Sequence, residues 1–314
     1  MKLLRIATRG SALALWQANY IRERLAQLHG VESELIRIRT SGDNFQGSSM
    51  AQLSEQIGMK GVFIKELEEA LLAGVADLAV HSMKDVPTEN PTGLVFPAIT
   101  KRGDVRDCLI SRDGRKLDDI SPGARVGTSS LRRQAQLRHR RPDVELLDLR
   151  GNVDTRLKKV AAGQFDAIVL AAAGIERLGA SDRIAQMFPP DIMLPAVGQG
   201  ALGIEVRADD RDTLELVAGL DDPESHAAVT CERALLRELE GGCQVPLGAW
   251  ARHENGELRL EAGVYSTDGK EFVRKELRGH ADDAERLGVG LGQILIEAGA
   301  DKILRLAGRS VGRN

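Results

Sequence analysis

Three stretches of this 314-residue chain hold side chains whose types and spacing suit chemistry. The first is HSMKDVP at residues 81–87, where Lys84 and Asp85 place an ammonium beside a carboxylate. It begins where a predicted strand at 77–80 ends, and α/β proteins bind ligands at the carboxyl ends of strands. Asp85 could stabilise a cation or take part in proton transfer. The alternative is an ordinary turn, because aspartate and proline are both frequent in turns.

The second stretch, residues 125–160, concentrates arginine and hydroxyl groups at two predicted strand-to-helix turns. Backbone N–H groups at a helix start favour anions, and guanidinium groups bind carboxylates or phosphates in a bidentate manner. The candidate anion-binding residues, which we call the arginine cradle, are Thr128, Ser129, Ser130, Arg132, Arg133, Arg150 and Arg156. The alternatives are a solvated basic helix face and a nucleic-acid site. Because residues 125–160 contain no Phe, Tyr or Trp, no stacking platform for bases is expected.

The third stretch is GGCQVP at 241–246, which follows a predicted helix at about 223–239. Cys243 in a glycine-flexible loop is expected to be exposed, and an exposed thiolate is reactive. The alternative is that Cys243 is a small core residue. Cys231 falls inside the predicted helix and Cys108 inside a strand pattern, so both are expected to be buried and inert.

The distribution of charge points to an anionic partner. The net charge is −3, yet residues 125–160 hold ten Lys or Arg side chains against four Asp or Glu, a local excess of +6. A concentration of one sign in a chain of the opposite net sign favours binding of a small anion or another acidic partner.

Composition argues against several other classes of protein. The three cysteines form no CxxC pair and the six histidines no HExxH pattern, so neither a disulfide framework nor a metal site is expected. No run of about 18 apolar residues predicts a membrane span. Arg5 and Arg9 come too early for the apolar part of a secretory signal. We therefore expect a cytoplasmic protein whose partners include no nucleic acid and no membrane.

The elements that must position these side chains alternate between strand and helix patterns over the first two thirds of the chain. This alternation predicts an α/β fold with mainly parallel sheets. Ser11 is expected to cap a helix that ends at Gly30. Residues 41–61 are polar and glycine-rich, which predicts a long loop. A helix is predicted at 131–140 in a second α/β stretch from about 106 to 194.

The pattern changes after residue 222. A helix at about 223–239 precedes two predicted strands, 257–265 and 271–278, joined by the hairpin signal Asp268-Gly269. A last helix is predicted at about 281–299. We therefore expect a separate small α+β domain at the C-terminal end.

Seven blocks of the sequence, in order and over essentially the whole chain, resemble the porphobilinogen deaminase family. They are RIATRGSALALWQ at 5–17, MKGVFIKELEEALL at 59–72, DLAVHSMKDVP at 77–87, VGTSSLRRQAQL at 126–137, DLRGNVDTRLKK at 148–159, LPAVGQGALGIE at 194–205 and GGCQVPLG at 241–248. The resemblance implies an α/β fold of two periplasmic-binding-protein-like lobes plus a small C-terminal α+β domain. Lobe one would be 1–100 with 201–218, lobe two 106–194, and the C-terminal domain 223–314. Crossing segments would lie near 101–105 and 195–200.

The family also implies a cofactor and a reaction. A dipyrromethane, made from the substrate, would be held as a thioether on Cys243 and would prime the addition of four porphobilinogen units. Water would then release the linear tetrapyrrole hydroxymethylbilane. Each substrate brings an acetate and a propionate, which accounts for a local excess of arginine. Loss of ammonia leaves an azafulvenium cation, and Asp85 would stabilise it.

The resemblance assigns the remaining site residues. Cofactor binding would involve Cys243, Lys84, Ser130, Arg132, Arg133, Arg150 and Arg156. Substrate binding would involve Arg9, Ser11, Arg150, Arg156, Arg177 and Gln199. The family suggests a monomer. The rival hypothesis is a non-catalytic, two-lobed binding protein for an acidic small molecule, which would have no use for Cys243 or for the third domain.

Overall fold

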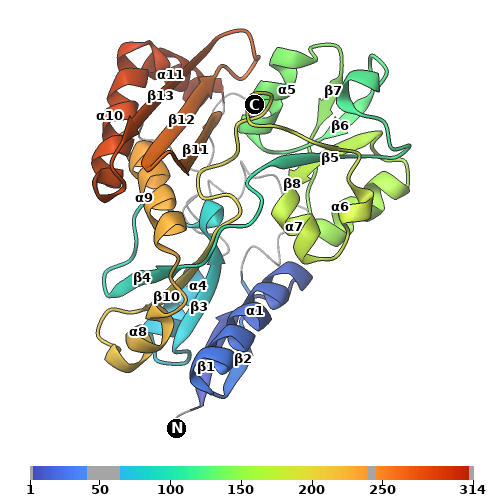
Figure 1. The fold of residues 1–314 in the computed structure, drawn as a ribbon. Coiled ribbons are helices and arrows are strands. Elements are labelled where there is room, and N and C mark those ends of the chain that lie inside the picture. The colour runs from blue at the N-terminus through green and yellow to red at the C-terminus, as the bar shows by residue number, and fades with distance from the viewer. Residues whose placement is uncertain (1–2, 41–63, 240–244, 311–314) are drawn as a thin grey trace. The chain divides into compact units, whose positions relative to one another are not determined.

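The computed structural model describes residues 3–40, 64–239 and 245–310, with side chains to residue 306 (Figure 1). Its contacts divide the chain into two units. Unit 1 comprises residues 1–102 and 201–226, and unit 2 comprises residues 103–200 and 227–314. Within the described ranges, no helix is long and apolar enough to cross a membrane. Cys243 and the whole of the predicted loop at 41–61 lie outside the described residues.

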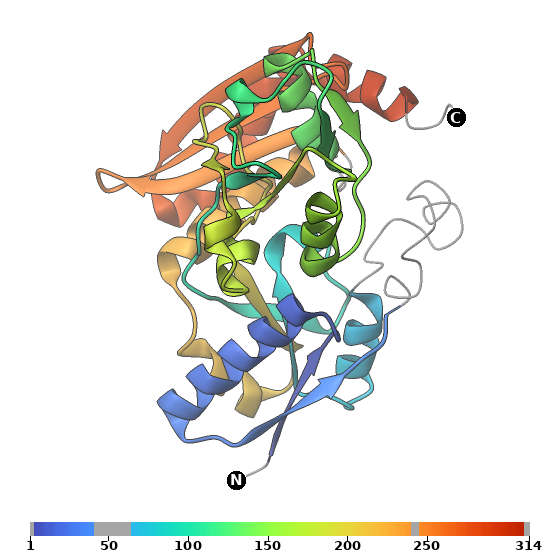
Figure 2. The ribbon, with the colours of Figure 1, turned by 90° about the vertical axis from the view of Figure 1, so that its right-hand side faces the viewer.

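Unit 1 is built on a five-stranded sheet in the order β2-β1-β3-β10-β4. The strands are β1 (Leu4–Thr8), β2 (Ser33–Arg37), β3 (Leu78–Ser82), β4 (Leu94–Ile99) and β10 (Leu202–Arg207). Strand β1 runs parallel to β2 and β3, whereas β10 runs antiparallel to β3 and β4. The helices are α1 (Ala12–His29), α4 (Lys65–Leu72) and α8 (Arg211–Ala218). Figure 2 shows α1 lying along the sheet, where its buried Ile21 and Leu25 pack on Leu4 and Ile6.

Helix α1 has both of the predicted boundaries. The Ser11 Oγ accepts a hydrogen bond from the Ala14 N–H, and Gly30 closes the helix at a φ of 63°. A hydroxyl at the N-cap and a glycine in the left-handed region are the usual local signals for the start and the end of a helix.

Unit 2 contains a second five-stranded sheet, in the order β7-β6-β8-β5-β9. Its strands are β5 (Asp107–Ser111), β6 (Arg125–Gly127), β7 (Glu145–Leu147), β8 (Ala167–Ala171) and β9 (Gln186–Met187). Strand β6 runs parallel to β7 and β8, and β5 runs antiparallel to β8 and β9. The helices are α5 (Leu131–Arg140), α6 (Val153–Ala161) and α7 (Ala172–Arg177).

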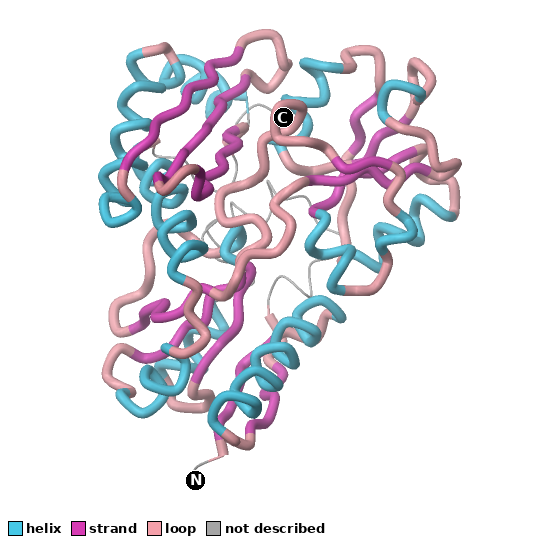
Figure 3. Tube along the Cα trace, in the orientation of Figure 1, coloured by secondary structure: helices cyan, strands magenta, loops and turns pink. Residues whose placement is uncertain are grey.

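The rest of unit 2 is an antiparallel three-stranded sheet with helices on one face (Figure 3). Its strands are β11 (Leu247–Glu254), β12 (Glu257–Tyr265) and β13 (Phe272–Gly279), and its helices are α10 (Ala284–Glu297) and α11 (Ala300–Ser310). Helix α9 (Pro223–Glu238) precedes them, and short 3-10 turns occur at Met83–Asp85, Leu117–Asp119, Ser181–Arg183 and Ala281–Asp283. The apolar faces of α9, α10 and this sheet form one core cluster.

The small C-terminal sheet is attached to the second five-stranded sheet by backbone contacts. The Ala249 N–H donates to the Pro195 carbonyl oxygen at 2.9 Å. The β12–β13 hairpin presents the carbonyl of Gly269 to the His139 ring at 2.9 Å, at the end of α5. Unit 2 therefore joins the arginine-rich helix to the domain that follows residue 240.

The predicted fold class, α/β with two sheet-containing lobes and a small C-terminal domain, is confirmed. The prediction of mainly parallel sheets is wrong, because each five-stranded sheet has equal numbers of parallel and antiparallel pairings. The chain leaves unit 1 after β4 and returns through β10, which inserts antiparallel between β3 and β4. A hydrophobic pattern predicts a strand but carries no information on its direction.

Two further expectations at the C-terminal end need correction. Strand β11 was not predicted, although its buried Leu247, Ala249 and Ala251 alternate as a half-buried strand requires. The helix predicted at 281–299 is confirmed as a 3-10 turn followed by α10, but α11, which begins beyond Gly299 with its φ of 97°, was not predicted. The predicted boundaries of the three domains remain a prediction.

A glycine on α10 gives a test of the C-terminal core. A Cβ at Gly288 would overlap the Cys231 carbonyl oxygen and lie 2.7 Å from the Ala234 Cβ, so α9 and α10 can approach only without it. We expect Gly288→Ala to lower the free energy of unfolding by about 1–3 kcal/mol, as overpacking of a core does. Urea unfolding followed by Trp250 fluorescence, in a Trp16→Phe background, measures this domain.

Gly290→Ala is the matched control. A Cβ at Gly290 would lie 3.4 Å from the Leu277 Cδ2, which is ordinary contact. Because alanine favours a helix by up to about 1 kcal/mol over glycine, this variant should be neutral or stabilised. Equal effects of the two substitutions would contradict the close packing of α9 on α10.

Candidate active site

Unit 1 contains a cavity of about 90 Å³ beside the carboxyl end of β3. Its polar lining residues are Arg9, Ser11, Gln17, His81, Ser82 and Asp85. Its apolar lining residues are Leu13, Ala14, Ile64, Leu67 and Val80. Three of the predicted site residues, Arg9, Ser11 and Asp85, therefore share one cavity wall.

The end of β3 positions Asp85. His81 and Ser82 end the strand, and the 3-10 turn Met83–Asp85 follows at once. Met83 and Val86 are buried on either side of the exposed Asp85, and the Met83 N–H donates to the Ala201 carbonyl. The two anchors fix the turn, as one of the two alternatives from the sequence predicted, and Asp85 in this turn lines the cavity. Lys84 is half-buried and is not among the residues that line the cavity.

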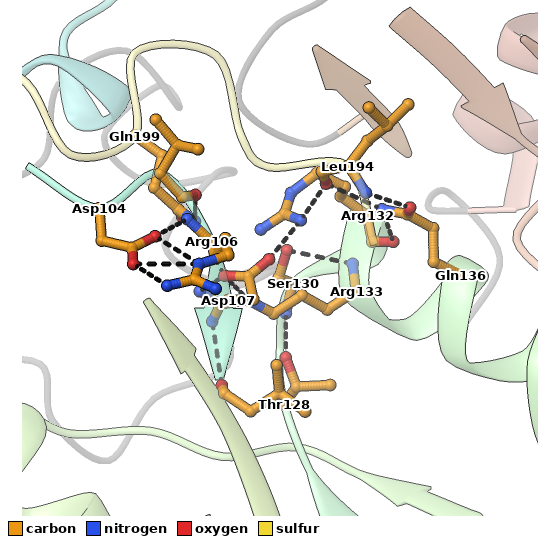
Figure 4. Close-up of polar contacts among 12 residues, drawn as sticks. Asp104, Arg106, Asp107, Thr128, Ser130, Arg132, Arg133, Gln136, Leu194 and Gln199 are labelled. Atoms are coloured by element: carbon orange, nitrogen blue, oxygen red, sulfur yellow. Dashed lines mark hydrogen bonds and ion pairs between the residues drawn. The ribbon is translucent and has the colours of Figure 1, made fainter. Parts of the chain in front are cut away.

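Unit 2 gathers part of the arginine cradle around one buried carboxylate, Asp107 (Figure 4). The Arg132 Nη1 donates to the Asp107 Oδ2 at 2.6 Å and to the Leu194 carbonyl at 2.6 Å. The Arg133 Nε and Nη2 donate to the Asp107 Oδ1 at 3.1 and 2.7 Å. The Gln199 Nε2 donates to the same Oδ1 at 3.0 Å. Asp107 is the first residue of β5 and was not identified from the sequence.

Charge does not balance within this cluster. The Asp107 side chain is 0% exposed, and those of Arg132 and Arg133 are 5% and 8% exposed. Among the carboxylates of the described residues, Asp107 alone contacts these guanidiniums, so two positive charges face one negative charge. Among the described residues, both hydrogen bonds of the Arg132 side chain are donated by Nη1, and the Nε and Nη2 make none. A buried excess positive charge is costly unless an anion accompanies it.

The two arginines change the pKa of the Asp107 carboxyl. Burial by itself would raise the pKa of the Asp107 carboxyl, but the charges and hydrogen bonds of Arg132 and Arg133 outweigh burial and hold that pKa well below its usual range. Burial also lowers the pKa of the Arg132 guanidinium, against the attraction of Asp107. Asp107 therefore stays ionised at neutral pH.

The hydroxyls of the cradle cap and join elements. The Ser130 Oγ accepts from the Arg133 N–H at the start of α5, and the Thr128 Oγ1 accepts from the Ser130 N–H at 3.3 Å. Ser129 exchanges hydrogen bonds with the backbone of Leu149, 3.0 Å in each direction. These contacts align the starts of α5 and α6.

The other predicted binding residues of unit 2 lie nearer the surface or on the crossing segments. Arg150 and Arg156 are half-buried at the start of α6, where the Arg156 Nε donates to the Gly151 carbonyl at 2.7 Å. Arg177 donates to the Gly200 carbonyl at 2.7 Å. Gln199 is fully buried and donates to the Val105 carbonyl as well as to Asp107. Gln199 therefore links the two predicted crossing segments.

Part of the arginine excess is balanced inside the protein. Arg125 pairs with Asp166, Arg140 with Asp118, and Arg132 and Arg133 with Asp107. All three of these carboxylates lie outside residues 125–160. The local excess of +6 therefore overstates the charge offered to a ligand.

The two described cysteines are poor nucleophiles. Burial, followed by the charge of Asp107, raises the pKa of Cys108 to about 12. Burial and the charge of Glu232 raise the pKa of Cys231 still further above its usual value. Both are buried, as predicted. A reactive thiolate in this chain would have to come from Cys243.

The fold and these clusters define an α/β protein with two sheet-containing lobes and a buried arginine pair suited to an anion. A family model described as "Porphobilinogen deaminase, dipyromethane cofactor binding domain" matches residues 4–215, and one described as "Porphobilinogen deaminase, C-terminal domain" matches 226–297. The chain belongs to the porphobilinogen deaminase family.

Individual relatives agree with the family match. The chain is 51% identical over 303 residues, 96% of each sequence, to a porphobilinogen deaminase of Pelotomaculum thermopropionicum. Matching solved structures include a periplasmic substrate-binding protein of an ABC transporter from Coxiella burnetii, at 12% identity and a TM-score of 0.43, covering 69% of this chain and 91% of that one. Another is the VFT2 domain of Bordetella pertussis BvgS, at 18% identity and a TM-score of 0.39, covering 69% and 85%. These two structures carry no conclusion about function.

Substitution of Asp107 tests the buried cluster. Asp107→Asn leaves two buried guanidiniums without a counter-charge, so the free energy of unfolding of unit 2 should fall by about 3–5 kcal/mol. Asp104→Asn is the matched control, because Asp104 pairs with Arg106 at 2.6 Å in a setting where the two side chains are 18% and 41% exposed. An exposed pair of this kind is worth about 1 kcal/mol or less.

The effect of Asp107→Asn should depend on pH. Because the pKa of Asp107 is lowered on folding, its contribution is complete above the unfolded carboxyl pKa of about 3.9 and is lost as pH falls through the folded value. The difference between wild type and Asp107→Asn in urea unfolding should therefore be constant from pH 5 to 7 and should narrow below about pH 4. A difference independent of pH would contradict an ionised Asp107.

Proposed function

We propose that this protein is an enzyme that deaminates porphobilinogen and joins four molecules of it into the linear tetrapyrrole hydroxymethylbilane. It is a transferase of tetrapyrrole biosynthesis, primed by a dipyrromethane attached through Cys243. The observation that carries this proposal is the family match over residues 4–215 and 226–297, which includes the cofactor-binding domain. A non-catalytic binding protein is not retained, because the chain matches this family over both its cofactor-binding and its C-terminal domains.

The buried arginine pair fits the cofactor. A dipyrromethane carries carboxylates, and the Asp107 cluster has one positive charge in excess with two Arg132 N–H positions turned to no described acceptor. The residues proposed to hold the cofactor are Cys243, Lys84, Ser130, Arg132, Arg133, Arg150 and Arg156. When bound, the cofactor supplies the pyrrole carbon from which the chain grows. Arg133 would act mainly by keeping Asp107 ionised, because its Nε, Nη1 and Nη2 already donate to Asp107 and to the Val169 carbonyl.

The residues proposed to bind the substrate are Arg9, Ser11, Arg150, Arg156, Arg177 and Gln199. Arg9 and Ser11 line the cavity that also holds Asp85, and they offer a guanidinium and a helix N-cap to a carboxylate. Arg150, Arg156 and Arg177 would serve the carboxylates of successive pyrroles. Gln199 is buried against Asp107, so its proposed role in substrate binding would be exerted through the arginine pair.

Asp85 is the proposed catalytic group. Loss of ammonia from porphobilinogen creates positive charge on the pyrrole ring and its nitrogen. An ionised carboxylate near that nitrogen gains attraction as the charge forms, so it stabilises the transition state more than the bound substrate. The exposed carboxylate of Asp85, held by the buried Met83 and Val86, is preorganised for this role.

The proposal extends to the state of the protein in the cell. We propose that it acts as a monomer in the cytoplasm. Support comes from the family resemblance. Sedimentation of the purified enzyme at micromolar concentration should give the mass of a single chain.

Attachment to Cys243 is tested by intact mass. The purified protein should be heavier than its sequence by two porphobilinogen units less two ammonia molecules. Cys243→Ser should remove this increment, because no other thiol is exposed among the described residues. Cys108→Ala and Cys231→Ala should keep it. A wild-type mass equal to that of the sequence, from cells with an intact pathway, would refute a covalent cofactor.

Two substitutions test the role of Asp85, one that removes the carboxylate charge and one that displaces it. Asp85→Asn deletes the charge at constant size, and turnover should fall by about a hundred- to thousand-fold. Asp85→Glu keeps the charge but moves it by one methylene, so partial activity should remain. Asp148→Asn, an exposed carboxylate that also follows a strand, is the control and should stay near wild type. The rate of tetrapyrrole formation is read by absorbance after oxidation. If Asp85→Asn keeps turnover within a few-fold, catalysis rests on another group.

A further inference from the structure

A buried histidine–carboxylate pair forms part of the same cavity wall as Asp85. The His81 Nε2 lies 2.9 Å from the Glu205 Oε2, and the two side chains are 4% and 0% exposed. His81 belongs to β3 and Glu205 to β10, which pair antiparallel with Gly203 opposite His81. His81 lines the cavity, whereas Glu205 is not among the residues that line it.

Nothing in the stability of the sheet requires this pair. A buried carboxylate must be compensated by partners, yet the Glu205 Oε1 has no hydrogen-bond partner among the described residues. Apolar residues of the same size would fill the space between β3 and β10 without that cost. A polar pair kept at a cavity wall next to a reactive carboxylate indicates a role in the chemistry of that cavity.

The hydrogen bond selects one form of the imidazole. With the Glu205 oxygen as acceptor, the hydrogen bond is donated by the Nε2–H, and Nδ1 is then the nitrogen with the free electron pair. The Phe96 ring packs against the imidazole in a T-shaped arrangement, with the two ring centroids 5.8 Å apart, and limits rotation of the imidazole. Beside it, the Gln17 Nε2 donates to the Ser82 Oγ at 2.9 Å and ties α1 to the same strand end. His81 is therefore held as a base in one orientation.

We propose that His81, oriented by Glu205, is the proton acceptor of the coupling step. This inference rests on the proposed function. In each cycle the C–N bond of porphobilinogen breaks and its electron pair leaves with ammonia. A C–C bond then forms from a π pair of the attacking pyrrole, whose α-carbon still carries a hydrogen. That C–H bond breaks, its electron pair restores the aromatic ring, and the proton passes to the His81 Nδ1.

The proton balance closes without another reagent. Porphobilinogen enters with its amino group protonated, so ammonia leaves with the C–N electron pair. The imidazolium then releases the coupling proton to solvent, where the ammonia takes up one proton to become ammonium, and His81 is neutral again for the next cycle. Asp85 has a separate task, since its carboxylate stabilises the cation electrostatically and does not take the coupling proton. Two groups with different tasks in one cavity are a common arrangement in acid–base catalysis.

Other charged groups face the pair and enter its pH dependence. Glu68 on α4 is close, because burial and then the charge of Glu205 raise the pKa of the Glu68 carboxyl. Asp85 and Arg9 share the cavity wall. Because these groups also titrate or carry charge, the pH profile must be compared between variants.

The turnover number of variants shows whether His81 accepts a proton in the reaction or has a structural role alone. We expect His81→Gln to lower kcat by about 10²–10⁴-fold and to change the pH dependence of kcat relative to wild type. Glu205→Gln, which keeps a hydrogen-bond acceptor for Nε2 but not the charge, should lower kcat by about 10–100-fold. His29→Gln, an exposed histidine at the end of α1, is the control. Added imidazole should restore part of the rate in His81→Ala.

A second readout does not depend on turnover. In protein labelled with ¹⁵N-histidine, the His81 resonances, assigned by their loss in His81→Gln, should report the form protonated at Nε2. Glu205→Gln should shift them toward a mixture of the two forms. The same result is expected in Cys243→Ser, which lacks the cofactor.

The possible results distinguish a failure of the proposed function from a failure of the proposed role of His81. If wild type forms no tetrapyrrole, the proposed function itself is wrong. If wild type is active and folded His81→Gln keeps kcat within threefold with an unchanged pH profile, only the role of His81 falls. A His81 ring protonated at Nδ1 in the active enzyme would also overturn it.

Discussion

The organisation of unit 2 depends on a single buried carboxylate with two guanidiniums. Asp107 opens β5, and Arg132 and Arg133 stand on the first turn of α5. An ion pair of this kind gains stability only when its geometry is close and its remaining hydrogen bonds are satisfied. Here the bonds of 2.6 and 2.7 Å, with the Leu194 and Val169 carbonyls as further acceptors, meet that condition. The start of β5 and the start of α5 are therefore fixed relative to each other, and this fixes the positions of the two arginine side chains.

The same cluster connects segments of unit 2 that are distant in sequence. Gln199 brings the crossing segment 195–200 to Asp107, and the Glu232 carboxylate on α9 accepts from the Gly198 N–H at 2.7 Å and from the Ala251 N–H at 2.8 Å. A continuous set of hydrogen bonds thus leads from β11, near the position of Cys243 in the sequence, to the arginine pair. Rigid support is what allows excess positive charge to remain aimed at a ligand instead of relaxing onto nearby carbonyls.

Local signals predicted much of the fold, and contacts distant in sequence account for what was missed. The limits of α1 and α5 follow from Ser11, Gly30 and Ser130, because caps are decided within a few residues. The insertion of β10 between β3 and β4 depends on a chain that leaves unit 1 and returns, which no local pattern records. The motif blocks singled out Arg9, Ser11 and Asp85, which all line one cavity of the structure, and their roles there stay a prediction. Asp107 was missed because its partners lie 25 and 26 residues away, although a charged residue in an otherwise apolar strand was a usable signal.

The central claim is that the arginine pair holds one positive charge in reserve for a carboxylate of the cofactor. Its most direct test is the stabilisation conferred by the attached cofactor, measured as the difference in unfolding free energy between cofactor-bearing protein and the Cys243→Ser form. We would measure this difference in an otherwise wild-type background and in Arg132→Gln, using protein whose mass confirms attachment. Because Arg132→Gln leaves Asp107 with Arg133 as a neutral pair, the stabilisation should shrink by about 1.5–3 kcal/mol, the worth of a hydrogen bond to a charged group. An equal stabilisation in both backgrounds would show that the charge is not reserved for the cofactor.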